Sequence, residues 1–378
     1  MDKFNAIRPY FNEEIIPALR RLVDENEFIS AVKYFLPEKS NDEIKKELLE
    51  ITTLEFFQKN FLSKIVDSLV NRSIKNLTFD GIENLKVGES YLFVSNHRDI
   101  VLDSALLNII LVKNDHETVQ IAIGSNLLIK PWIVDFVKIN KSFIVQRDVP
   151  QRDAYESSHL LSSYIDFARN TLNESIWIAQ REGRSKNGDD KTQPGLLKML
   201  SLCSNGNFIE YFKSLKIVPV SISYEYDPCD VLKTQEIYSI SNNKDYKKTS
   251  KDDLNSMLHG IIGYKGRVHF SIGKPLTDVL DNIDASKGTN DKIKDIASII
   301  DYNIVKNYKL WPSNIFAYKF LNNKDYDTSN ISQEEEIEFV NYVNKKFSDI
   351  TSDVEEHKKI FFDMYSKPIE NKINNINL

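Results

Sequence analysis

The residues best suited to chemistry follow an apolar run at positions 91–95. That run is rich in β-forming residues and is typical of a buried strand, while the apolar residues after Asp99 predict a buried helix. The intervening His97 would then lie at the carboxyl end of a sheet strand, where open α/β sheets bind their ligands. There His97 could act as a general base beside a carboxylate that orients and stabilises it, or simply be a polar residue of a capping turn.

Two later strands also end in polar residues. Arg147 closes the apolar run 143–147, where its guanidinium could bind a phosphate or carboxylate with two hydrogen bonds or form a surface ion pair. The run 175–180 opens into a turn that contains Arg181, Glu182, Gly183, Arg184, Ser185 and Lys186. Glycine permits close approach of the backbone to a ligand, and the cations Arg184 and Lys186 would complement a dianionic phosphate. We favour an anion site here over a solvated basic loop.

The elements expected to position these residues form an α/β domain. Strands are predicted near residues 76–80, 90–95, 118–123, 143–147, 175–180, 217–224 and 267–272. Helices are predicted over residues 100–113, 131–138, 153–173, 194–203, 253–262 and 290–308. This alternation favours a mixed, mostly parallel sheet flanked by helices.

Helical segments are expected on both sides of this α/β domain, which spans residues 76–310. Residues 1–75 carry helical apolar stripes, and packing against the main domain is favoured over a membrane-facing or regulatory appendage. Residues 311–378 predict a helical extension, with helices over 332–347 and 352–366 and a frayed end at 371–378. The polar stretch 226–252 is interpreted as a surface excursion.

The composition limits the classes of function. The chain has 378 residues, a net charge of −6 and two cysteines, Cys203 and Cys229. The acidic balance argues against nucleic acid as a partner, and two cysteines support neither a disulfide framework nor a cysteine zinc cluster. The first residues lack the apolar core of a signal peptide, and no run of about 18 apolar residues predicts a membrane span. We therefore expect a cytoplasmic protein.

Four motifs, taken in order, resemble the glycerolipid acyltransferase family. They are a histidine with a downstream acid at 97–103, Phe-Ile-Val-Gln-Arg at 143–147, Glu-Gly-Arg-Ser at 182–185 and Val-Pro-Val at 218–220. The resemblance covers residues 77–225 and extends less closely to 275. The family includes glycerol-3-phosphate and 1-acylglycerol-3-phosphate acyltransferases, and the helical N-terminal segment and the residues 124–127, 186–188 and 224–225 favour the first branch.

Two departures from the family pattern affect the assignment of roles. The family motif is His-x4-Asp, whereas five residues separate His97 from Asp103. Either the start of the helix absorbs one residue and Asp103 is the partner, which we favour, or Asp99 takes its place. The third motif is one residue shorter than Glu-Gly-x-Arg-Ser, so Glu182 or Arg181 could occupy the glutamate position, whereas Arg184 fits the family arginine better.

The resemblance implies transfer of a fatty acyl group from an acyl-CoA or acyl-carrier-protein thioester to a hydroxyl of glycerol 3-phosphate or 1-acylglycerol 3-phosphate. His97 would be the general base, Asp103 or Asp99 would orient it, and neither a metal ion nor a cofactor besides the thioester co-substrate is required. Residues expected to bind the acceptor are Arg98, Arg147, Glu182, Gly183, Arg184, Ser185 and Lys186. The other histidines, His116, His159, His259, His269 and His357, are predicted to be structural or surface residues.

Acyl chains come from or go to a bilayer, so the resemblance also implies peripheral contact with the inner face of a membrane. The N-terminal helices and the aromatic-rich segment 309–320 are candidates for this contact, although the segment could equally be core. An amino-acid lipid or a lysophospholipid is an alternative acceptor. A non-catalytic lipid-binding protein with a degenerate site is the alternative from another class, supported by the altered spacing after His97.

Overall fold

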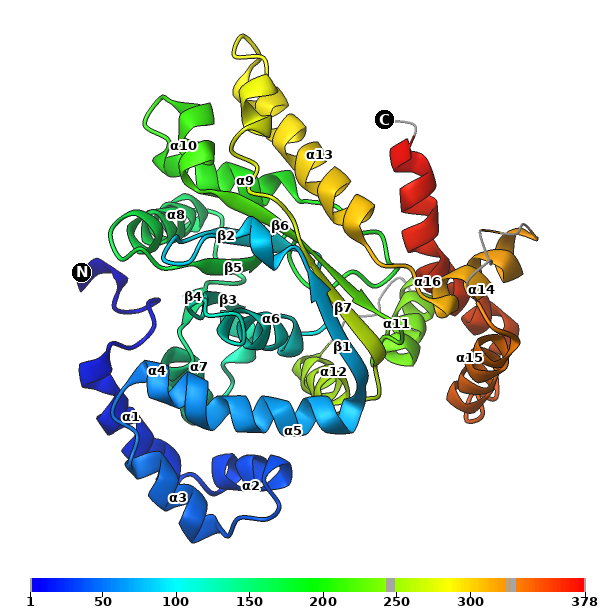
Figure 1. The fold of residues 1–378 in the computed structure, drawn as a ribbon, viewed down its shortest axis with the longest axis horizontal. Helices are drawn as coiled ribbons and strands as arrows, with labels where there is room; N and C mark the ends of the chain where they lie inside the picture. The colour runs from blue at the N-terminus through cyan, green and yellow to red at the C-terminus, as the bar shows by residue number, and fades with distance from the viewer. Residues whose placement is uncertain (1, 243–248, 324–325, 327–330, 377–378) are drawn as a thin grey trace.

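A seven-stranded mixed sheet forms the centre of the computed structural model, which describes residues 2–242, 249–323, 326 and 331–376 (Figure 1). The strand order is β1-β7-β6-β2-β5-β3-β4. The strands are β1 (Ile74–Asp80), β2 (Leu92–Ser95), β3 (Gln120–Gly124), β4 (Ser142–Val145), β5 (Ile176–Ala179), β6 (Ile217–Tyr224) and β7 (Gly266–Ile272). Every neighbouring pair is parallel except β6 with β7. The predicted mixed, mostly parallel sheet is confirmed.

The central strands β2, β5 and β6 coincide with clear apolar runs in the sequence, and their burial explains this pattern. Nearly all of their residues are buried, as expected of parallel strands that are covered on both faces. Because β2, β4 and β5 run in the same direction, the loops that follow them emerge at one edge of the sheet. This edge therefore brings together the residues that the sequence analysis selected.

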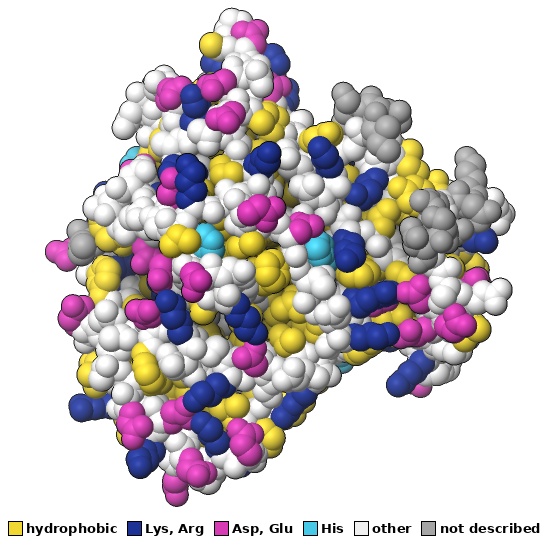
Figure 2. Space-filling model, viewed as in Figure 1, with side chains coloured by type: hydrophobic (Ala, Val, Ile, Leu, Met, Phe, Trp, Pro, Cys, Tyr) yellow, Lys and Arg dark blue, Asp and Glu magenta, His cyan; other side chains and the backbone are white. Residues whose placement is uncertain are grey.

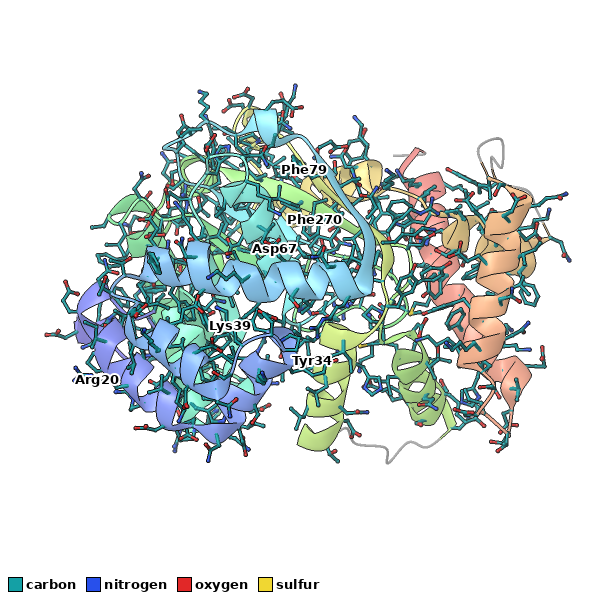
Figure 3. The ribbon with its side chains drawn as sticks, turned by 60° about the horizontal axis from the view of Figure 1, so that its bottom comes forward. Arg20, Tyr34, Lys39, Asp67, Phe79 and Phe270 are labelled. Carbon is teal, nitrogen blue, oxygen red and sulfur yellow. The ribbon has the colours of Figure 1, made fainter. Side chains whose placement is uncertain are left out.

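Helices cover both faces of the sheet. One apolar core joins the sheet to α8 (Ala154–Asn170), α9 (Pro194–Leu200), α10 (Phe208–Ser214) and α13 (Thr289–Asn307). A second core joins the other face to α5 (Ser63–Ser73) and α6 (Leu102–Val112). Figure 3 shows α5 crossing in front of the sheet, and Phe270 of β7 is fully buried in the core on that side.

The N-terminal helices pack against the α/β domain. They are α1 (Asn12–Asp24), α2 (Asn26–Phe35), α3 (Asn41–Leu49) and α4 (Leu54–Phe56). Their apolar residues share a core with α7 (Pro131–Ile139), whose Asp135 accepts hydrogen bonds of 2.7 Å from Tyr10 and Arg21. Burial against α7 accounts for the apolar stripes of this segment.

The second half of the chain contains both predicted and unpredicted helices. The predicted ones are α12 (Ser250–Ile262), α15 (Gln333–Lys346) and the first part of α16 (Val354–Ile376), and those not predicted are α11 (Asp230–Asn242) and α14 (Pro312–Asn322). The interpretation of 226–252 as a surface excursion is wrong for its first part, because α11 buries Asp230, Lys233 and Thr234; residues 243–248 lie outside the described part of the chain. The predicted frayed end is wrong for 371–376, which continue α16, whereas 377–378 are not described.

The aromatic-rich segment 309–320 is mostly core. The indole of Trp311 is 4% exposed and donates a 3.2 Å hydrogen bond to the carbonyl of Ser223, and Ser313 donates one to the carbonyl of Glu225. Phe320 is exposed, whereas the buried residues of α14 pack mainly on α15 and α16. Of the two alternatives for this segment, the structure favours core over membrane contact.

The molecular surface carries both signs of charge. On the face in Figure 2, cationic and anionic side chains are interspersed, which agrees with the modest net charge of −6. Among the described residues, no helix combines the length and the apolar character needed to cross a membrane.

Candidate active site

A cavity of about 1740 Å³ opens at the carboxyl edge of the sheet. Ligand pockets commonly have volumes of about 300–1,000 Å³, so this one has room for two bulky substrates. His97, Arg147, Gly183, Arg184 and Lys186 all line it, although they come from the loops after three different strands. Glu182 lines it as well. The fold thus gathers most of the predicted residues around one space.

His97 is held by Asp103 at the edge of this cavity. Its Nδ1 lies 2.8 Å from Oδ2 of Asp103, and the same oxygen accepts hydrogen bonds from the backbone N–H groups of Arg98 and Asp99. Asp103 is fully buried, whereas the His97 side chain keeps 12% exposure. A carboxylate oxygen fixed by three contacts can hold the imidazole in one orientation, with Nε2 free for a substrate.

Asp99 has a different place. Its Oδ1 accepts hydrogen bonds from the N–H groups of Val101 and Leu102 and so caps the start of α6. Burial, followed by the nearby Asp103 carboxylate, raises the pKa of Asp99. Five residues separate His97 from Asp103, one more than in the family motif, and the loop before α6 accommodates the additional residue. Asp103, rather than Asp99, therefore contacts His97.

Two of the predicted binding residues point away from the cavity. The guanidinium of Arg98 is buried, pairs with Asp190 and lies over the ring of Tyr308 at 5.4 Å. Ser185 is also buried and hydrogen-bonds to the carbonyl of Asp189 within its own turn. Neither residue is among those that line the cavity, so both support the loops that do.

The cations of the cavity differ in how their charge is balanced. Arg147 pairs with Glu182 at 2.7 Å, in a contact where Glu182 is 65% exposed. Lys186 pairs with Glu236 of α11. Arg184 instead donates to two neutral groups, Oγ of Ser256 at 2.7 Å and Sγ of Cys229 at 3.3 Å.

The contacts of Arg184 leave its charge without a hydrogen-bonded carboxylate among the described residues. The Asp99 and Asp227 carboxylates interact with its charge without hydrogen-bonding to it, so the guanidinium can still donate to an anion in the cavity. Gly183 precedes it with φ of +67°, a conformation that glycine adopts without strain, and open space surrounds its Cα. A ligand can therefore approach the backbone next to Arg184.

The cavity also has an apolar part near His97. The indole of Trp177 contacts the imidazole ring edge-on, with centroids 5.6 Å apart, and donates a 3.0 Å hydrogen bond to Ser95. Apolar side chains continue this surface along the ends of β3, β4 and β5 and over α8 and α9: Ile100, Ala122, Ile123, Leu127, Val145, Leu161, Ile178, Ala179, Leu196 and Met199. This surface fits a hydrocarbon chain next to the histidine.

The cavity contains residues that the sequence analysis did not select. Arg181 lines it with a buried Nε that has no hydrogen-bond partner within the described chain, and the basic turn at 181–186 was the available signal. Lys233, Glu236 and His357 also line it, from α11 and α16. No local pattern marks these three, because only the tertiary fold brings their helices to the cavity.

The part of the chain that carries His97, Arg147 and Arg184 matches a protein family. Residues 76–223 match the family described as Acyltransferase. No curated protein matches the chain. Among solved structures, the chain is similar to the crystal structure of the 1-acyl-sn-glycerophosphate (LPA) acyltransferase PlsC from Thermotoga maritima, with 13% identity and a TM-score of 0.37 over 79% of this chain and 98% of that one. The matched family residues include His97, Asp103, Arg147 and Arg184.

Proposed function

We propose that this chain, whose residues 76–223 form a domain of the acyltransferase family, moves a fatty acyl group from an acyl-CoA or acyl-carrier-protein thioester to a hydroxyl of glycerol 3-phosphate or 1-acylglycerol 3-phosphate. The observation that carries the proposal is the 2.8 Å contact between His97 and the buried Asp103, beside a large cavity that this domain shares with later helices. The reaction needs no cofactor other than its thioester co-substrate.

His97 would act as the general base. Its Nε2 would take the proton of the acceptor hydroxyl while the oxygen attacks the thioester carbonyl, and Asp103 would stabilise the resulting imidazolium. When the tetrahedral intermediate collapses, the C–S bond breaks and the imidazolium returns the proton to the leaving thiolate. Proton transfer of this kind contributes roughly 10²–10⁴-fold to a rate.

Arg184 would hold the phosphate of the acceptor. Its guanidinium lines the cavity and has only neutral hydrogen-bond partners, so it could form charge-assisted hydrogen bonds with a phosphate. Arg147, nearer the solvent, would assist when its ion pair with the exposed Glu182 opens. Fixing the phosphate positions the hydroxyl for attack, which lowers the entropic part of the barrier.

A peripheral position on the inner face of a membrane would supply the acyl chains. Leu254, Leu258 and Ile262 are exposed and recur every four residues on one side of α12, Asn255 beside them lines the cavity, and Ser256 lines it from the opposite side of the helix. An exposed apolar stripe next to the cavity fits a lipid surface. Leu258→Glu is expected to reduce co-sedimentation with anionic liposomes, and unchanged co-sedimentation would contradict this placement.

The experiment that tests the function measures release of free thiol by the purified protein. Palmitoyl-CoA and palmitoyl-carrier protein serve as donors, with glycerol 3-phosphate, 1-acylglycerol 3-phosphate or no acceptor. The proposal expects release that depends on one of these acceptors and falls about 10²-fold or more in His97→Ala. Turnover only with a lysophospholipid or an acylated amino acid would move the assignment to that acceptor, and no turnover with any acceptor would support a non-catalytic lipid-binding protein.

A further inference from the structure

His357 lines the cavity although it belongs to α16, which lies far along the sequence from the matched residues 76–223. The side chain is nearly buried, and its ring stacks on Tyr238 of α11 with centroids 4.1 Å apart and an interplanar angle of 26°. The hydroxyl of Tyr238 donates a 2.7 Å hydrogen bond to the Asp353 carboxylate, which lies one turn before His357. The imidazole is thus held in a fixed orientation by its neighbours.

The hydrogen bond at Nδ1 sets the chemistry of the other ring nitrogen. Nδ1 lies 3.0 Å from the backbone carbonyl oxygen of Asp353. A carbonyl oxygen can only accept, so Nδ1 must carry the proton, and in the neutral ring Nε2 is then an unprotonated acceptor. No described residue donates a hydrogen bond to Nε2.

His357 lies along the same helix face that contacts the basic turn. A Cβ added to Gly188 would meet the carbonyl oxygen of Met364 at 2.5 Å, so this turn runs close against α16. Met364 follows His357 by seven residues, which is about two helical turns on the same side. Lys186 of the same turn forms an ion pair with Glu236 of α11. Figure 3 shows α11 lying between α12 and the C-terminal helices.

The surroundings of His357 favour a neutral ligand group. Lys186 is paired with Glu236, and Lys233 is paired with Asp227, so neither cation is left to balance a bound anion. Arg184, which donates to Ser256 of α12, is the cation proposed to hold the acceptor phosphate, and Asp252 also lines the cavity. Most other polar side chains that line the cavity from these segments are uncharged: Asn187, Gln235, Ser239 and Asn255. The nitrogen that His357 offers is a hydrogen-bond acceptor, so it suits a hydroxyl or an amide N–H rather than a phosphate.

We propose that Nε2 of His357 accepts a hydrogen bond from a hydroxyl or amide N–H in the polar, non-reacting part of a substrate. The inference rests on the proposed function, since it concerns the substrates of the same cavity. Such a donor group occurs in two places: the free hydroxyl of a glycerophosphate acceptor, and the amides of the pantetheine arm that carries the acyl thioester. His357 is a binding residue in either case, and it takes no part in proton transfer to the reacting atoms.

The test measures equilibrium binding by calorimetry. The probes are glycerol 3-phosphate, 1-acylglycerol 3-phosphate, palmitoyl-CoA and palmitoyl-carrier protein, each with the wild type and with His357→Phe, which keeps an aromatic ring to stack on Tyr238. Loss of the acceptor nitrogen is expected to raise Kd about 5-fold or more, for the acceptor probes or for the thioester probes but not for both. The class that weakens identifies the source of the donor group.

Two further variants separate binding from packing. His357→Gln offers an amide oxygen as acceptor and should recover part of the lost affinity. Tyr238→Phe removes the hydroxyl contact with Asp353 but keeps the stacked ring, and should leave every Kd within about 2-fold. The proposal is overturned if all four probes bind His357→Phe within 2-fold of wild type, if both probe classes weaken equally, or if the wild type binds none of them. Failure of the proposed function would appear separately, as binding without acceptor-dependent thiol release.

Discussion

The two sides of the cavity are built in different ways. The side at the sheet edge, here called the strand-end wall, consists of the loops after β2, β3, β4 and β5 together with α8 and α9, and it carries His97 and most of the apolar surface. The other side, here called the helical wall, consists of α11, α12 and residue His357 of α16, and its cavity-lining residues are mostly polar. His97 and Asp103, the groups proposed to react, therefore lie on one wall, and much of the remaining polar contact surface lies on the other.

Specific contacts join the two walls. Arg184 of the strand-end wall donates to Ser256 of α12, and Lys186 pairs with Glu236 of α11. The basic turn at 181–186 is thus contacted by helices that lie outside the matched residues 76–223. Under the proposed function, we expect the chemistry to depend on the strand-end wall and substrate selection to depend on both walls.

The largest expected effect separates the two aspartates of the strand-end wall. Asp103→Asn should lower kcat by about 10²–10⁴-fold, because the amide no longer stabilises the imidazolium of His97. Asp99→Asn should keep kcat within about 3-fold, because the amide oxygen can still accept the N–H bonds at the start of α6. Steady-state thiol release at saturating acceptor measures both.

The variants Asp103→Asn and Asp99→Asn serve as controls for each other. Both substitutions replace a buried carboxylate by an amide of the same size, so a general loss of folding would affect both variants, and thermal unfolding would reveal it. Equal losses of kcat in two well-folded variants would contradict the assignment of Asp103 as the partner of His97.

The next largest effect concerns Lys265, which follows α12 of the helical wall in the sequence. Lys265 is fully buried and donates to the carbonyls of Ile261 and Gly263 at the end of α12 and to Ser73. Burial lowers its pKa from 10.5 to about 8. Between pH 8 and 10.5 the unfolded chain binds more protons than the folded one, so stability rises with pH over this window.

Lys265→Met should remove that rise. Relative to the variant, the wild type should gain stability, up to about 3 kcal/mol, as the pH increases from 8 to 10.5. Urea unfolding of both proteins at four pH values measures the difference. A constant difference across the window would mean that the folded lysine keeps an ordinary pKa.

The strand-end wall was largely predictable from the sequence. All seven strands were expected within a few residues of their observed positions, because buried parallel strands are short apolar runs bounded by polar turns. His97, Arg147 and Arg184 follow directly after such runs, so their convergence on one sheet edge follows from parallel topology alone.

The helical wall could not be predicted in the same way. The sequence 226–252 is rich in charged and polar residues, which by composition indicates solvent exposure. In the structure Lys233 pairs with Asp227, and Asp230 accepts hydrogen bonds from Tyr342 and Tyr365, so these charges are buried with partners. Such pairing depends on contacts between segments that are distant in the sequence. The position of His357 at the cavity also depends on such contacts, so the sequence indicated only a structural or surface residue.

A smaller effect should distinguish the two arginines of the cavity. Arg184→Met is expected to raise KM for a phosphate-bearing acceptor about 10-fold or more, because the variant loses a partly buried guanidinium whose hydrogen-bond partners in the chain are neutral and which would bind the phosphate. Arg147→Met should raise KM less, about 2- to 3-fold, because its charge is already paired with the exposed Glu182. The KM for the thioester donor serves as the reference, and a larger effect at Arg147 would reverse the assignment of the main phosphate-binding residue.

The smallest effect tests whether the apolar part of the strand-end wall holds the acyl chain. Ala122 of β3 lines the cavity, and Ala122→Leu would place three additional carbons into that space. Each methylene that can no longer be buried costs about 0.8 kcal/mol, so the ratio of kcat/KM for palmitoyl-CoA over decanoyl-CoA should fall by about 4-fold or more. Ser239 of α11 lines the helical wall, and Ser239→Leu adds similar bulk there without changing this ratio if the chain lies at the strand-end wall. If Ser239→Leu alone shifts the chain-length preference, the acyl chain lies against the helical wall, and the division of roles between the two walls is reversed.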